Sequence, residues 1–269
     1  MNYLALSDRE FTYFRNLLYE HTGIAMAAHK KALVAGRLAP RLRHHGLESY
    51  RAYFELATDR SGQSELQIVC DLLTTNETYF YREPKHFDFL REHIIAKRAP
   101  GGTFRIWSAA SSSGEEVYTL AFVLADACGV RDSWEILGSD ISSRVLARAR
   151  AGRYPLERIK GIPPANLKEY CLKGVGAADG DFLIAKRLRD RVRFISVNLN
   201  AGLPDIGMFD VIFVRNVMIY FDTDTKREVV QRLASKLNTG GYLFVSHTET
   251  LNVLSEAFEV VHASIYRKR

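Results

Sequence analysis

From residue 84 onward, short apolar runs typical of β-strands alternate with amphipathic runs typical of α-helices. This alternation is the signature of an α/β domain built on a mostly parallel sheet. Helices are expected between most of the strands, but three glycines within 172–190 favour a small antiparallel excursion there. The predicted strands cover 103–109, 134–139, 192–196, 209–215 and 242–246, with a final pair near 258–261 and 264–267.

Residues 1–83 lack this alternation and are predicted to form a string of helices followed by a linker. Ser7 and Glu10 make a capping box, which predicts a first helix over about 8–21. In a second helix, Pro40 removes an amide donor and is expected to kink or divide it. The buried stripe of this second helix is predicted to hold Leu33, Leu38 and Leu42, and shorter helices are expected near 49–58 and 64–73. The chain is therefore divided into a helical domain over 1–83 and an α/β domain over 84–269.

Positive charge predominates in the sequence, which has a formal net charge of +6 and a pI near 9.2. A positive surface raises the rate of encounter with acidic partners, whether nucleic acid, anionic membrane or acidic protein. The charge is concentrated at residues 29–51, where lysines and arginines face the single acid Glu48. Such a run is either a solvated helix face or a docking surface.

The composition also bears on location and on cysteine chemistry. No run approaches the roughly 18 uninterrupted apolar residues of a membrane span, and Asp8 and Glu10 interrupt the start before a signal-peptide core can build. A cytoplasmic protein without direct membrane insertion is therefore expected. Because the three cysteines, Cys70, Cys128 and Cys171, are far apart and in apolar surroundings, we expect neither disulfides nor a metal site.

The stretch FRIWSAASSSGEEVYTLAFVLA at 104–125 is predicted to be a buried strand, a loop of small residues and a helix. This geometry brings a nucleotide-like ligand against backbone amides, although small residues also serve merely to pass a tight turn. The loop departs from GxGxxG, and the helix opens with Glu115 and Glu116, whose charges would repel a phosphate. Carboxylates suit S-adenosylmethionine instead, because it carries a sulfonium, an ammonium and two ribose hydroxyls.

Polar residues end several of the predicted strands, at the edge where open α/β sheets bind ligands. Asp140 follows the second strand, close to the spacing at which an acid receives ribose hydroxyls, or else caps the helix that begins after Ser142. The other residues at strand ends are Asn198, Arg215, Asn216 and Tyr220.

Four segments together resemble the chemotaxis receptor methyltransferase family, CheR: TTNETYFYREPKHF, WSAASSSGEEVYTLAF, the SDI at 139–141, and VRNVMIYF. Their order and spacing match across nearly the whole chain. The resemblance implies a class I S-adenosylmethionine-dependent methyltransferase core, which is Rossmann-like, with a small helical N-terminal domain. It also implies an inserted antiparallel β-subdomain, which corresponds to the excursion near 172–190.

The resemblance further implies roles for individual residues. Cofactor contacts are assigned to Asn76, Thr78, Arg82, Glu116, Asp140, Asn198, Leu199, Arg215 and Asn216. Arg82, Arg215 and Tyr220 are placed beside the transferred methyl group as the catalytic set. Pattern alone favours a plainer interpretation of the first segment, in which Thr75 or Asn76 caps a helix and Arg82 pairs with Glu83 at a surface.

The implied reaction is methyl transfer from S-adenosylmethionine to glutamate side chains of chemoreceptors, leaving S-adenosylhomocysteine. A glutamate is already anionic near neutral pH, so its attack on the methyl needs no general base. Receptor helices rich in glutamate would suit the basic run, and Arg37, Arg41 and Arg43 are predicted to contact them.

Some family members also bind a pentapeptide at the receptor's C-terminus by adding a strand to the β-subdomain. Here Lys173 and the LIA at 183–185 stand where such members have arginines. Because lysine cannot make the same forked contact with a carboxylate, these departures weigh against tight pentapeptide binding.

Two other functions compete with receptor methylation. A nucleic-acid methyltransferase would suit the basic pI, but VRNVMIYF lacks the Pro-Pro-aromatic segment of enzymes that methylate exocyclic base amines. In a non-catalytic adenosylmethionine sensor, the catalytic set Arg82, Arg215 and Tyr220 would have no function. We therefore expect no nucleic-acid partner.

Overall fold

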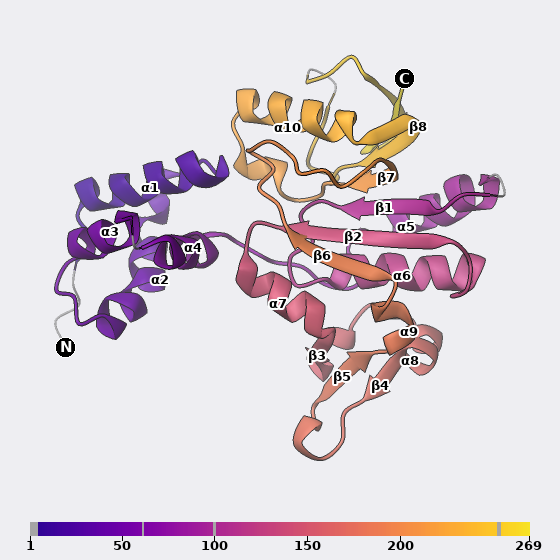
Figure 1. The fold of residues 1–269 in the computed structure, drawn as a ribbon, viewed down its shortest axis with the longest axis horizontal. Helices are drawn as coiled ribbons and strands as arrows, with labels where there is room; N and C mark the ends of the chain where they lie inside the picture. Colours follow the sequence, from indigo (N-terminus) through magenta and orange to yellow (C-terminus); the bar gives the residue numbers. More distant parts are fainter. Residues whose placement is uncertain (1–4, 61, 99–100, 252–253) are drawn as a thin grey trace. The chain divides into compact units, whose positions relative to one another are not determined.

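A computed structural model describes residues 5–60, 62–98, 101–251 and 254–269. The chain forms two compact units, Met1–Thr75 with Tyr220–Lys226, and Asn76–Ile219 with Arg227–Arg269. Figure 1 traces the chain through both.

The first unit is helical, as predicted. Its elements are α1 (Asp8–Thr22), the 3₁₀ turn η1 (Ala28–Lys30), α2 (Lys31–His44), α3 (Tyr50–Thr58) and α4 (Gln63–Leu73). The capping box is confirmed, since the Ser7 amide donates to Glu10 Oε2 (2.9 Å) and the Glu10 amide donates to Ser7 Oγ (3.2 Å). Aromatic and aliphatic side chains fill the core of this unit, among them Phe14, Leu18 and Tyr53, which are completely buried.

Two expectations about the second helix need correction. The helix α2 is not divided at Pro40, because it is continuous from Lys31 to His44, and the alternative of a kink there stays a prediction. Its buried stripe is Val34, Leu38 and Leu42, which recur every four residues on one face, while Leu33 is only half-buried. We attribute the continuity to this packing, because burial of Leu38 and Leu42 on either side of Pro40 offsets the one lost hydrogen bond.

The second unit contains a seven-stranded sheet in the order β6-β2-β1-β7-β8-β10-β9. From β6 to β8 all neighbours are parallel, and β10 is antiparallel to both β8 and β9. Figure 1 shows β7, β1, β2 and β6 following one another across the sheet. The strands are β1 (Phe104–Ser108), β2 (Trp134–Asp140), β6 (Val192–Ser196), β7 (Phe209–Phe213), β8 (Leu237–Phe244), β9 (Phe258–His262) and β10 (Ile265–Lys268).

Helices and short turns connect these strands. The helix α6 (Glu115–Cys128) is apolar on all sides and buried from Val117 to Ala125, so it forms part of the core. The others are α5 (Lys85–Phe89), the π-helical turn η2 (Leu90–Ile94), η3 (Ile95–Lys97), α7 (Ser143–Ala151), η4 (Leu156–Ile159), α8 (Pro164–Tyr170), α9 (Lys186–Arg189), η6 (Met218–Tyr220) and α10 (Thr223–Ser235).

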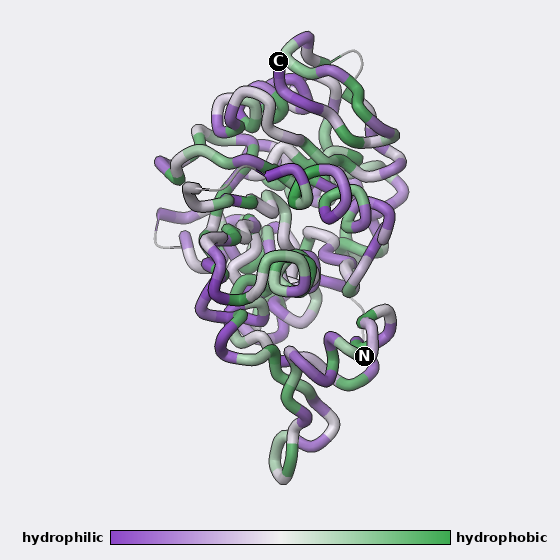
Figure 2. Tube along the Cα trace, turned by 90° about the vertical axis from the view of Figure 1, so that its right-hand side faces the viewer, coloured by the Kyte–Doolittle hydropathy of each residue, from purple (hydrophilic) through white to green (hydrophobic). Residues whose placement is uncertain are grey.

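A separate antiparallel sheet, in the order β3-β5-β4, confirms the small β-subdomain. It contains β3 (Arg153–Pro155), β4 (Cys171–Lys173) and β5 (Asp181–Ile184), with the 3₁₀ turn η5 (Gly176–Ala178) between the last two. The turn between β4 and β5 projects at the lower end of Figures 1 and 2. The sequence did not reveal β3, because three residues that include a proline carry no measurable periodicity.

Candidate active site

The loop after β1 turns sharply before α6, as the strand–loop–helix pattern predicts. Gly114 has φ 97°, and a side chain there would meet Ala149 Cβ at 3.0 Å, so this position requires glycine. Ser112 is also left-handed, with φ 48°. A non-glycine residue in this region is strained, and such strain gathers at ligand sites.

Asp140 ties the end of β2 to this loop. Its Oδ2 accepts a hydrogen bond from the Ser112 amide (2.9 Å), and its Oδ1 accepts one from the Ser142 amide (2.9 Å). Ser142 in turn caps α7 with its side chain. Asp140 is therefore not itself the N-cap of α7, as the alternative interpretation would require. Its carboxylate fixes the loop after β1 and the amide of the cap residue Ser142.

Arg215, just beyond β7, is buried and forms the centre of a charged network. Its Nη1 donates to Glu116 Oε2 (2.9 Å), and its Nη2 donates to the Arg82 carbonyl oxygen (2.5 Å). Nη2 also lies 3.3 Å from Glu83 Oε2. The structure thus brings together three segments that lie far apart in the sequence, as the resemblance implies.

Glu116 sits between Arg215 and the end of β1. Ser108 Oγ donates to Glu116 Oε1 (2.8 Å), so both carboxylate oxygens are engaged. Burial raises the pKa of Glu116, while the Arg215 guanidinium and the Ser108 hydroxyl act in the opposite direction. Because burial is the largest of these effects, the negative charge of Glu116 is not fully offset by its partners. A cation in contact with Glu116 would stabilise that charge.

The segment 76–82 lies against the same loop. Ser112 Oγ donates to the Asn76 carbonyl oxygen (2.9 Å), and Arg158 donates to the Thr78 carbonyl oxygen (2.8 Å). Arg82 does not pair with Glu83. Instead its Nη1 donates to the Glu77 carbonyl oxygen (2.8 Å) and its guanidinium lies over the Tyr79 ring at 5.7 Å. The surface ion pair that pattern alone favours is therefore absent.

The remaining candidates lie at neighbouring strand ends. The Val197 amide donates to the Asp140 carbonyl oxygen (3.1 Å), which places Asn198 and the buried Leu199 beside the end of β2. Asn198 Oδ1 accepts from the Asn200 amide (2.9 Å). Asn216 is left-handed, with φ 58°. Tyr220 belongs to the other compact unit, so its place beside the methyl group stays a prediction.

Two acids in the network were missed at the sequence level. Glu249 accepts hydrogen bonds from the Asn216, Ile219 and Ser246 amides (3.1, 3.2 and 2.8 Å) and so holds the turn after β7. Glu83 has a left-handed backbone, with φ 57°. Its side chain faces Arg215 and also accepts a hydrogen bond from Asn216 Nδ2 (3.4 Å). The TET at 248–250 gave no signal beyond an ordinary polar loop.

The predicted receptor-contact arginines differ in their surroundings within the helical unit. Arg37 donates to the carbonyl oxygens of Leu72, Leu73 and Thr74 at 2.9–3.2 Å, at the end of α4. Arg41 makes a forked contact with the buried Glu65 (2.8 and 2.7 Å). Arg43 is exposed.

Glu65 depends on this pairing for its charge. Hydrogen bonding to Arg41, with help from Tyr53 and His45 and against the effect of burial, lowers its pKa to about 2. Because the folded-state pKa lies below the unfolded value, the pair contributes stability above about pH 4.5 and loses it as the pH falls toward 2.

We expect Arg41→Ala to loosen the helical unit, because it leaves a buried carboxylate unpaired at a cost of about 3 kcal/mol. Hydrogen exchange of the α2 and α4 amides at pH 7 should accelerate by roughly 10²-fold. Arg43→Ala is the matched control and should leave exchange unchanged. Equal protection in both variants would show that the Arg41–Glu65 contact contributes nothing to folding.

Comparison with known proteins decides the family. The CheR methyltransferase all-alpha domain model matches residues 9–74, and the CheR methyltransferase SAM binding domain model matches residues 76–267. The chain belongs to the CheR methyltransferase family. The predicted class I S-adenosylmethionine-dependent methyltransferase fold and cofactor are thereby confirmed, and this CheR protein is a methyltransferase.

Curated relatives of this CheR chain extend over nearly its whole length. The chemotaxis protein methyltransferase of Salmonella typhimurium is 39% identical over 265 residues, 98% of this chain and 91% of the relative. That of Escherichia coli is 39% identical over 98% of this chain and 92% of its own. Chemotaxis protein methyltransferase 2 of Pseudomonas aeruginosa is 38% identical over 96% and 92%. Within the described residues, no helix has the length and apolar character that crossing a membrane requires.

Proposed function

We propose that this CheR protein transfers the methyl group of S-adenosylmethionine to glutamate side chains of chemoreceptors, forming glutamyl methyl esters in the cytoplasm. In this proposal the helical domain over 1–83 recognises the receptor, and the domain over 84–269 binds the cofactor. The names of the relatives at 38–39% identity support a chemotaxis role. The charged network around Arg215 supports methyl transfer to a carboxylate, because it places a guanidinium at the strand ends.

One observation carries the assignment of the cofactor site. Arg215 Nε and Ser111 Oγ are buried, and neither has a hydrogen-bond partner among the described residues. Leaving such donors unpaired costs free energy, so each would be stabilised by a hydrogen-bond acceptor on a bound ligand. They lie on two of the segments, after β7 and after β1, to which cofactor contacts are assigned. A ligand with a carboxylate and hydroxyls fits these donors and the nearby acids.

We assign the cofactor-binding residues as Asn76, Thr78, Arg82, Glu116, Asp140, Asn198, Leu199, Arg215 and Asn216. Asp140 would accept the ribose hydroxyls, and Glu116 would face the positive part of the ligand. The bound cofactor supplies an electrophilic methyl on a sulfonium. Its demethylated product has lost that charge, so carboxylates at the strand ends favour the donor over the product.

The protein's part in the reaction is to orient the substrate carboxylate and exclude water. Arg215 already donates hydrogen bonds to Glu116 and to the Arg82 carbonyl group. It would therefore orient the substrate carboxylate without forming a bidentate ion pair with it. A tight bidentate ion pair would lower the nucleophilicity of the carboxylate. Arg82 and the Tyr220 hydroxyl are proposed as the other groups beside the methyl.

Receptor recognition is proposed for the basic run that includes Arg37, Arg41 and Arg43. Because Arg37 and Arg41 also hold α4, reversing all three charges would disturb folding as well as recognition. Arg43 and Lys30 are both exposed, so they test charge complementarity more cleanly. Leu172 in β4 and Val175 in the turn after it are exposed. Lys173 cannot make the forked contact that an arginine makes with a carboxylate, and we propose that no tight pentapeptide contact forms there.

The proposal is tested by incubating the full chain with methyl-tritiated S-adenosylmethionine and a chemoreceptor cytoplasmic fragment. Label on glutamate is an ester, so mild alkali should release it as volatile methanol. A Lys30→Glu, Arg43→Glu variant should keep its cofactor affinity and lose roughly 10-fold in methylation rate at low salt. Alkali-stable label on the receptor, or transfer to nucleic acid, would refute glutamate esterification.

A further inference from the structure

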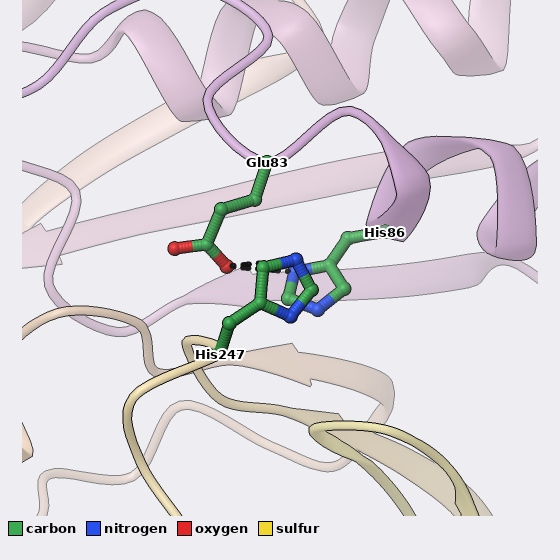
Figure 3. A group of neighbouring side chains, drawn as sticks. All are labelled: Glu83, His86 and His247. Atoms are coloured by element: carbon green, nitrogen blue, oxygen red, sulfur yellow. Dashed lines mark ion pairs between the residues drawn. The ribbon is translucent and has the colours of Figure 1, made fainter.

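Three side chains from two distant segments of the chain meet beside the Arg215 guanidinium. His86 lies at the start of α5, Glu83 lies in the loop before that helix, and His247 follows β8. Glu83 Oε2 lies 3.5 Å from His86 Nδ1 and 3.9 Å from His247 Nε2. Figure 3 shows the carboxylate directed at both imidazole rings. One ligand-type atom from each residue lies within 4.8 Å of the other two.

The far sides of both rings share a single partner. Ser264 Oγ lies 2.7 Å from His86 Nε2 and 3.1 Å from His247 Nδ1, and it is also 2.6 Å from the Ala263 carbonyl oxygen. If the hydroxyl donates its one proton to that carbonyl group, it accepts from both rings. This arrangement puts the ring protons on the side of Ser264. The two nitrogens that face Glu83 are then unprotonated.

The cluster consequently presents three lone pairs to one point. Glu83 Oε2 and His86 Nδ1 are both buried without a hydrogen-bond partner among the described residues, and His86 is only 1% exposed. The Arg215 guanidinium faces only Glu83 Oε2 among these atoms, at 3.3 Å, so the converging lone pairs can accommodate a further cation.

We propose that Glu83, His86 and His247 bind a divalent transition-metal ion. Two imidazoles and one carboxylate are a common ligand set for zinc, cobalt and iron, and Ser264 provides the outer hydrogen bonds that orient metal-bound histidines. In a tetrahedral zinc site neighbouring ligand atoms are roughly 3.3 Å apart. The 3.5 and 3.9 Å distances from Glu83 Oε2 are close to this value, and all three ligand atoms lie within 4.8 Å of one another, so binding would draw them together. His247 is partly exposed, which leaves an open side for water.

The site shares Glu83 with the charged network around Arg215. Glu83 Oε2 is also 3.3 Å from Arg215 Nη2, so a bound ion and the guanidinium compete for the same oxygen. No cysteine takes part, and the sequence predicts no metal site, because His247 lies more than 160 residues from Glu83 and His86 in the chain.

The experiment titrates Zn²⁺ into the full-length chain in competition with a chromophoric zinc indicator. Wild type should bind one equivalent that His247→Ala weakens by about tenfold or more, and Ser264→Ala should weaken it by about tenfold. His262→Ala is the matched control, since this exposed histidine lies outside the cluster. Co²⁺ should give visible absorption in wild type and lose it in His247→Ala.

Zinc bound by other surface histidines, such as the His44–His45 pair, appears equally in all variants and cancels in the comparison. His247 is partly exposed, so its replacement does not threaten the core, and unchanged far-UV circular dichroism verifies folding. Equal zinc affinity and stoichiometry in wild type and His247→Ala would overturn the proposal. In that case His86 Nδ1 carries a proton toward Glu83.

Discussion

Arg215→Ala is expected to lower kcat/KM for receptor methylation by roughly 10²–10³-fold. The buried guanidinium joins Glu116 to the Arg82 carbonyl group, and its removal leaves buried acids without a counter-charge. Initial-rate assays with a receptor fragment measure the effect.

Arg187→Ala is the matched control for this loss. Arg187 is half-exposed, pairs with Glu169 and lies in α9, outside the proposed site. Its replacement should leave kcat/KM within about twofold of wild type. If Arg215→Ala retained activity within threefold of wild type, the charged network would have no part in catalysis or cofactor binding.

Asp140→Ala is expected to weaken S-adenosylmethionine binding by roughly 100-fold, or about 2.7 kcal/mol. Two causes act together, since the substitution removes the proposed ribose acceptor and releases the Ser112 and Ser142 amides. Isothermal titration calorimetry measures the affinity, and thermal unfolding reports the accompanying loss of stability.

The same variant resolves the two roles considered for Asp140. Asp190→Ala, at an exposed position paired with Lys186, should change neither quantity. A purely structural role, in which Asp140 only holds the Ser112 and Ser142 amides, predicts lower stability in Asp140→Ala with unchanged affinity for the cofactor. That outcome would remove Asp140 from the cofactor site.

Much of the site could be predicted because parallel strands end at a common edge. Once the strands before Asp140, Asn198 and Arg215 are recognised from their apolar runs, the sheet itself brings these residues together. The Ser7 capping box succeeded for a similar reason, since its two partners are three residues apart. Local patterns and sheet topology were sufficient in these cases.

Other contacts depend on how long side chains cross between segments. Nothing in the sequence near Arg41 indicates that it reaches Glu65, or that Arg37 reaches the end of α4. A basic run therefore looked uniformly available to a partner, although only some of its members are free of contacts that hold the fold. Glu83 and Glu249 were missed for the same reason, because the contacts of Glu83 with Arg215 and of Glu249 with Asn216 join residues more than 30 positions apart.

The most direct test of a cofactor site at the strand ends is a calorimetric titration of the intact chain with S-adenosylhomocysteine. Saturable binding at one site per chain is the predicted result, with affinity reduced in Asp140→Ala and unchanged in Asp190→Ala. Absence of binding by the folded wild-type protein would contradict it.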